Sequence, residues 1–187
     1  NIIKHTDRLF TRLMICQWFF GVAMALWISP TAWAGTVSRI HLHVWAAVFL
    51  GGAVTSLPVL LARLQPGRVL TRHAIAVGQM LMSALLIHLT GGRIETHFHV
   101  FGSLAILAFY RDWRVLISAA VVVVVDHLVR GIFWPQSVFN VVHAPIWRSL
   151  EHGGWVGFEV TFLIISIRNS LRETLAIAER QAKLENI

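Results

Sequence analysis

Long apolar stretches, separated by short polar ones, make up most of this chain. The breaks predict six helices, over about residues 9–28, 41–62, 70–90, 97–110, 114–133 and 152–170. Most of them approach the roughly 20 apolar residues that cross a bilayer, although 97–110 is short for a full span. Turn-forming sequences lie between them, namely ISPTAWAG, LQPGR, TGG and FWPQS. The pattern predicts an all-α membrane protein with a six-transmembrane-helix bundle, over residues 1–168.

The last part of the chain has a different character. The sequence SIRNSLRETLAIAERQAKLENI is polar, rich in helix-forming residues and free of Gly and Pro. It carries a stripe of apolar residues with 4-3-4 spacing, formed by Leu171, Leu175, Ala178 and Ala182. We therefore interpret residues 169–187 as a cytoplasmic connector helix with a coiled-coil character. A connector implies something to connect, so we expect a cytoplasmic output domain beyond it.

Composition supports the membrane assignment and excludes other classes. The chain is 56% hydrophobic and 13% charged, whereas soluble domains carry about 25% charged residues. Cys16 is the single cysteine, which excludes an internal disulfide and a thiolate-rich metal site. The basic start and TAWAG are also compatible with a cleaved signal peptide. Gln17 and the bulky tryptophans around this run favour a retained span instead.

The basic residues are unevenly divided between the two predicted sides. Of the 16 Lys and Arg residues, 12 share a side with both termini, and the other side holds Arg39, Arg93, Arg130 and Arg148. This bias places both termini in the cytoplasm of a multi-pass protein of the plasma membrane. The net charge of +7 is thus a topology signal, and we expect membrane lipid as a partner and no nucleic acid.

Histidines gather on the opposite, outer side. Of the ten histidines, only His5 and His73 fall on the cytoplasmic side, and His143 lies in an outer loop beside Ala-Pro. Neutral imidazole binds Zn, Cu, Ni and Fe, and carboxylates complete many such sites. The candidate metal ligands are His41, His43, His88, His97, His99, His127, His152 and Glu159.

Depth and helix geometry refine this set. His127 and Glu159 lie about 10 Å inside their spans at 1.5 Å per residue, where ionisable groups usually face a partner or a cavity. Asp126 is spaced to pair with Arg130 one turn later, whereas the partner of Glu159 has to come from another helix. Residues two apart on a helix diverge by about 200°, so we expect one ligand from each His-x-His pair. The set then divides into two layers, with His88, His127 and Glu159 below the others.

Several site chemistries remain open at this point. The metal is Fe, Cu or Zn, as one or two ions, and bis-histidine haem is a weaker alternative because two facing histidines suffice for it. A periplasmic proton-sensing or pH-sensing histidine network fits the same residues. A di-iron membrane enzyme usually carries longer His-x-x-His motifs on the cytoplasmic side. A metal transporter requires polar groups through the inner half of the bundle, which is nearly bare of them.

Four segments resemble a known family: WISPTAWAG, HLHVWAAVFLGGA, IHLTGGRIETHFHVFGSLAILAFYRDWRVL and IAERQAKLE. They are similar to the N-terminal multi-helix membrane sensor region of bacterial sensor histidine kinases, also found before diguanylate cyclase or chemotaxis-receptor outputs. The resemblance covers nearly the whole chain. It implies a homodimeric signal-input domain of a two-component system in the bacterial inner membrane. We expect no catalytic residues in this segment and a histidine kinase as the full-length protein. The resemblance assigns no ligand.

Together these observations predict a sensor domain with a histidine-rich metal site near the periplasmic face. The metal is either the stimulus itself or a cofactor that reports oxygen, another small gas or the redox state.

Overall fold

A computed structural model describes residues 2–185, without the side chains of Trp33 and Ala34. The helices are α1 (Ile2–Ile28), α2 (Leu42–Trp45), α3 (Gly51–Leu64), α4 (Val69–Leu89), α5 (Ile94–Leu107), α6 (Trp113–Phe133), α7 (Gln136–Phe139) and α8 (Ile146–Glu185). A π-helical segment, Ala46–Leu50, joins α2 to α3, and a 3-10 turn, Ala108–Tyr110, follows α5. Two short strands, β1 (Thr31–Ala34) and β2 (Val37–Ile40), form an antiparallel hairpin.

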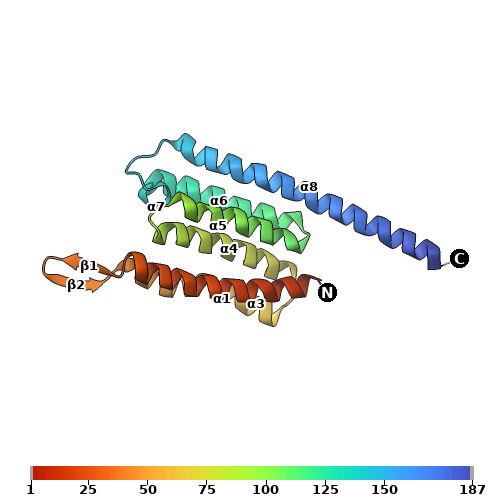
Figure 1. Ribbon diagram of the computed structural model, residues 1–187, viewed down its shortest axis with the longest axis horizontal. Helices are drawn as coiled ribbons and strands as arrows, with labels where there is room; N and C mark the ends of the chain where they lie inside the picture. The colour runs from red at the N-terminus through yellow and green to blue at the C-terminus, as the bar shows by residue number, and fades with distance from the viewer. Residues whose placement is uncertain (1, 186–187) are drawn as a thin grey trace.

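The long helices run alternately up and down (Figure 1). α1, α4 and α6 run toward the end that carries the hairpin and α7, and α3, α5 and α8 run back. We call the hairpin end the outer end and the opposite end, where α1 begins, the inner end. The second half of α8 projects beyond the inner end of the bundle.

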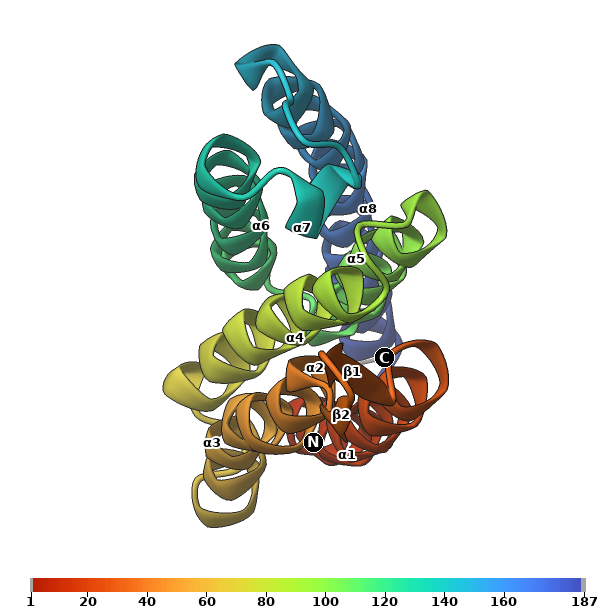
Figure 2. The same ribbon diagram turned by 90° about the vertical axis from the view of Figure 1, so that its left-hand side faces the viewer.

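α4 occupies the centre of the bundle. Figure 2 shows α1 and α3 on one side of α4, with α6 and α8 on the other. The larger of two apolar core clusters joins these layers through Phe10 of α1, Ile75 of α4, Leu104 of α5, Leu116 of α6 and Val160 of α8. The histidine-bearing ends of α4, α5, α6 and α8 are thereby held against one another.

The structure has four helical stretches that are long and apolar enough to cross a membrane, which are Ile2–Ile28, Leu42–Leu64, Val69–Leu89 and Trp113–Phe133. These four indicate a membrane protein. α5, with 14 residues, and the 40-residue α8 are not among them. Helices thus cover all six predicted segments, although α1 and α8 begin several residues earlier than predicted, and four of the six have the length and composition of a span.

The hairpin between α1 and α2 was not predicted from the sequence. Each strand has only four residues, and the sequence TAWAGTVSRI predicts a break between helices. Gly35 lies in the turn with φ of +67°, a conformation that favours glycine. The hairpin adds a small β element at the outer end of an otherwise α-helical chain.

At the inner end, the Asp7 carboxylate fastens three segments together. Asp7 is completely buried. It accepts a hydrogen bond from the Gly67 backbone N–H (2.6 Å) and one from the Tyr110 hydroxyl (2.7 Å). The rings of Phe10 and Tyr110 stack beside it, 5.5 Å apart. The start of α1, the α3–α4 turn and the 3-10 turn after α5 are thus joined through one carboxylate.

At the outer end, Gly92 allows the α4–α5 turn to pack against the turn after α7. Gly92 has φ of +72°, and a Cβ atom there would lie 2.7 Å from the Asn140 nitrogen and 2.8 Å from the Val138 oxygen. Only glycine fits such an approach. The contact brings the first turn of α5 beside α7, next to the histidines described below.

Candidate functional site

Three predicted ligands meet where α5, α6 and α8 converge. His97, His127 and His152 each face the other two, and we call them the histidine triad. Their ring centres are 5.5 Å apart for His97 and His127, 5.4 Å for His97 and His152, and 5.7 Å for His127 and His152. His97 and His127 are only 5% and 3% exposed. The triad is therefore a buried contact between three helices.

The same local hydrogen bond fixes the orientation of all three rings. In each, the Nδ1–H donates to the carbonyl of the residue four positions earlier: His97 to Arg93 (2.9 Å), His127 to Val123 (3.0 Å) and His152 to Arg148 (2.8 Å). Helical side chains lean toward the N-terminus, which brings this carbonyl within reach. A neutral imidazole that donates from Nδ1 keeps its lone pair on Nε2. No described residue hydrogen-bonds any of the three Nε2 atoms, and that of His97 is completely buried.

An aromatic ring and a cavity border the triad. Phe139 of α7 packs against His127 and His152, with ring centres 6.2 Å and 5.0 Å away. The guanidinium of Arg148 lies 5.3 Å above the same phenyl ring. A cavity of about 350 Å³ reaches His97 and His152 from the outer end, and Arg93, Glu95, Asn140 and Arg148 also line it. The cavity thus borders two members of the triad, His97 and His152.

A second histidine cluster lies between the start of α2 and the end of α4. The ring centres of His41 and His43 are 4.3 Å apart, and those of His43 and His88 are 4.8 Å apart. Trp134 packs on His88 at 4.7 Å. The Nδ1 of His88 lies 2.9 Å from the Ser137 hydroxyl. These three histidines are the second histidine cluster.

The expected divergence within His-x-His pairs holds for one pair and is wrong for the other. His97 and His99 are both inside α5 and have different neighbours, as the helical geometry requires. His41 precedes α2 with extended backbone angles, and its Nδ1 accepts the backbone N–H of His43 (3.0 Å). Because His41 is a helix cap and not a helical residue, its ring remains beside that of His43.

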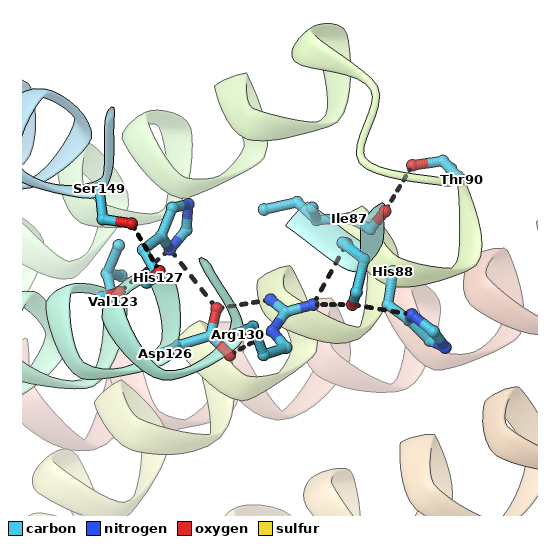
Figure 3. A network of polar contacts seen from close by, with 9 residues as sticks. Ile87, His88, Thr90, Val123, Asp126, His127, Arg130 and Ser149 are labelled. Carbon is cyan, nitrogen blue, oxygen red and sulfur yellow. Dashed lines mark hydrogen bonds and ion pairs between the residues drawn. The ribbon is translucent and has the colours of Figure 1, made fainter. Parts of the chain in front are cut away.

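A chain of polar contacts connects the two groups of histidines (Figure 3). Arg130 donates to Asp126 (Nε to Oδ1, 2.7 Å), which confirms the predicted pair. The Nη1 of Arg130 also donates to the Ser137 hydroxyl (2.8 Å), which in turn contacts His88. At the other end, Oδ2 of Asp126 lies 3.4 Å from Nδ1 of His127. The second nitrogen of the His127 ring points away from the α6 axis (Figure 3).

His99 belongs to neither group. The Ser83 hydroxyl donates to the Gln79 carbonyl (2.9 Å), so it accepts the Nδ1–H of His99 at 2.8 Å. The Nε2 of His99 then accepts from the side-chain amide of Gln17 at 2.9 Å. Both ring nitrogens are occupied, and His99 connects α1, α4 and α5 as a polar link inside the bundle.

Glu159 also stands apart from the histidines. It lies on α8 seven residues after His152, and its Oε2 is buried. No hydrogen bond or ion pair joins Glu159 to another residue within 2–185. The partner expected on another helix is therefore not found among the described residues of this single chain.

The eight predicted ligands thus form two separate clusters and two isolated residues, instead of two layers. His88 contacts His43, and His127 contacts His97 and His152. Each of these contacts joins a histidine of the predicted lower layer to one of the predicted upper layer. Among the described residues, no group of three or more His, Cys, Asp or Glu side chains meets the geometry of a metal site as it stands. The triad has suitable ring spacing, but its rings have to turn before three Nε2 atoms meet at one point.

Comparison with known proteins gives one similarity. The chain is similar to the transducer protein Htr8 of Halobacterium salinarum, with 36% identity over 90 residues. These residues make up 46% of this chain and 14% of the transducer, so the match covers a small part of that protein. No protein-family model matches the chain. No solved structure matches it either.

Proposed function

We propose that this chain is the signal-input region of a membrane signalling protein, and that the histidine triad is its transition-metal site. The partial similarity to a transducer protein and the four candidate spans support the signalling and membrane parts of this proposal. The observation that carries the metal assignment is the triad, whose three rings donate from Nδ1 and keep Nε2 for a ligand.

The spacing of the triad fits one ion. Two imidazoles that bind a tetrahedral ion at about 2.1 Å have ring centres about 5 Å apart. The observed separations of 5.4–5.7 Å are close to this value, and the rings have to turn for their Nε2 atoms to meet at one ion. Hydrogen bonds from Nδ1 to backbone carbonyls are the usual outer support of metal-bound histidine.

Three neutral nitrogens favour Zn, Cu, Fe or Ni over the oxygen-preferring Mg and Ca. Three protein ligands leave the fourth position open, and the adjoining cavity of about 350 Å³ lets water or a small gas reach it. A bis-histidine haem requires two rings on opposite faces of a macrocycle, whereas these three rings face one another. A bare transition-metal ion, as the stimulus or as a sensor of redox state or gas, is the form we propose.

The proposed topology has six membrane passes with both termini in the cytoplasm of a bacterial inner membrane. The alternating helices and the 12 basic residues predicted on the side of the termini support it. Leu171 and Leu175 on the projecting part of α8 are 39% and 64% exposed, which suits a dimeric coiled coil. We infer a homodimer with an output domain, of the histidine kinase or receptor type, after α8.

Metal binding at the triad offers a direct route for the signal. His152 lies on α8, the same continuous helix that leaves the bundle, while His97 and His127 lie on α5 and α6. An ion bound by all three holds α8 against the other two helices. Its loss or change of charge releases this restraint, and coupling between sites usually amounts to about 1–3 kcal/mol.

A fusion of this chain to a histidine kinase output tests the proposal. We expect kinase activity to change by about fivefold or more between metal-loaded and chelated membranes, which corresponds to the lower end of usual coupling energies. His152→Ala abolishes the difference, whereas His73→Ala, whose ring bonds Ser118 (2.8 Å), preserves it. An unchanged response of the His152→Ala fusion would show that the triad does not control α8.

A further inference from the structure

The second histidine cluster contains ligand atoms that the triad does not use. His43 and His88 come from different helices, and their rings meet edge-on with centres 4.8 Å apart. Nδ1 of His43 is buried without a hydrogen-bond partner among the described residues. The Ser137 hydroxyl lies 2.9 Å from Nδ1 of His88. In the tautomer in which this hydroxyl accepts the Nδ1–H of the ring, Nε2 of His88 keeps its lone pair for another contact. Packing alone explains the aromatic contacts but gives no partner for the His43 nitrogen.

His41 has a different part in this cluster. Its Nδ1 accepts a hydrogen bond from the backbone N–H of His43. The lone pair of this nitrogen is therefore already engaged. In a neutral ring the hydrogen then lies on Nε2, which cannot bind an ion while it carries that hydrogen. His41 therefore fixes the backbone of His43 at the start of α2, and the cluster offers two ligands.

Open space lies beside the rings of His43 and His88. A cavity of about 480 Å³ opens next to them, lined among others by His43, His88, Trp134, Ser137 and Asn140. None of its lining side chains is a carboxylate. Neutral nitrogen donors without carboxylates suit transition-metal dications and not Mg or Ca.

We propose that His43 and His88 form a second transition-metal site, separate from the triad, with water or a small ligand completing the coordination. Ser137 is its positioning residue. The Ser137 hydroxyl holds Nδ1 of His88 at 2.9 Å and is itself held by Arg130 at 2.8 Å. The inference does not depend on metal binding at the triad.

Zinc stoichiometry separates this proposal from the previous one. The purified chain without a His-tag, in detergent, is dialysed against Zn²⁺ and analysed by mass spectrometry of the metal. We expect two ions per chain, one after the double substitution His43→Ala and His88→Ala, and one after His97→Ala with His127→Ala. A wild-type count of one that only the triad substitutions remove would overturn the second site alone. A count of one that only the His43 and His88 substitutions remove would overturn the triad instead.

Ser137 is tested in the background of the two triad substitutions, where one site remains. Ser137→Ala is expected to weaken Zn²⁺ binding there about 10-fold, the usual lower effect of removing an outer hydrogen-bond partner of a metal-bound histidine. Ser137→Thr retains a hydroxyl and is expected to restore the affinity. The matched control is Ser118→Ala, which removes the same serine–histidine contact from His73 at 2.8 Å. Equal affinities for Ser137→Ala and the background chain would exclude the positioning role.

Discussion

Replacement of His127 by alanine is expected to lower the affinity of the triad for Zn²⁺ by about 100-fold or more. Loss of the hydrogen-bond partner of a metal-bound histidine lowers metal affinity by about 10–100-fold. Removal of the ligand itself is expected to lower the affinity at least as much. His127 touches both other members of the triad, so its removal leaves only His97 and His152 near the ion.

The affinity is measured by competition with a zinc chelator, in a chain that also carries His43→Ala and His88→Ala. This background leaves the triad as the one site under test. The control is His73→Ala, because its ring bonds Ser118 on α6, near the inner end of the bundle. Unfolding curves of each variant show whether the helices remain assembled. An affinity within about threefold of the background would contradict a triad ligand at position 127.

The second large effect concerns stability at the inner end. Asp7→Ala is expected to reduce the free energy of unfolding by about 3 kcal/mol, because it leaves one buried and one half-buried donor without an acceptor. Those donors are the Gly67 backbone N–H and the Tyr110 hydroxyl, at 2.6 Å and 2.7 Å from the carboxylate. Three segments of the bundle lose their common contact in this variant.

Two milder substitutions separate the contributions of the two hydrogen bonds to Asp7. Asp7→Asn keeps the shape and one acceptor oxygen, and Tyr110→Phe removes one hydrogen bond, so each is expected to cost about half as much or less. Denaturant unfolding in detergent, followed by circular dichroism, measures all three. A change below about 0.5 kcal/mol for Asp7→Ala would show that the carboxylate does not fasten the inner end. Zinc affinity at the triad is expected to remain unchanged, because Asp7 lies at the opposite end of the bundle.

Local features of the sequence predicted much of the helical framework. The length of an apolar stretch and its flanking turn residues are local properties, so all six helical segments could be found from the sequence. Two starts were wrong, because α1 begins at residue 2 instead of 9 and α8 at residue 146 instead of 152. The Asp126–Arg130 pair is likewise one helical turn apart and was predictable from spacing. The β hairpin was not, because strands of four residues carry little periodic signal.

The division of the histidines into two groups depends on how the helices pack. The sequence placed His88 and His127 in the same lower layer, yet α4 brings His88 to His43, while α6 brings His127 to α5 and α8. The roles of Ser137 and Phe139 had no signal in the sequence, since neither lies in a recognisable motif. The hydrogen bond from Nδ1 of each triad histidine to a carbonyl of the preceding helical turn was the easiest feature to predict, because any helical histidine can reach that carbonyl.

X-ray absorption spectroscopy of the zinc-loaded chain tests the central claim most directly. In the background with His43→Ala and His88→Ala, the proposal predicts one ion with three imidazole nitrogens at about 2.0–2.1 Å and one further light ligand. The multiple scattering typical of imidazole should fall when His97, His127 or His152 is replaced by alanine. A bound ion without imidazole scattering, or a chain that binds no zinc in this background, would contradict the triad as the metal site.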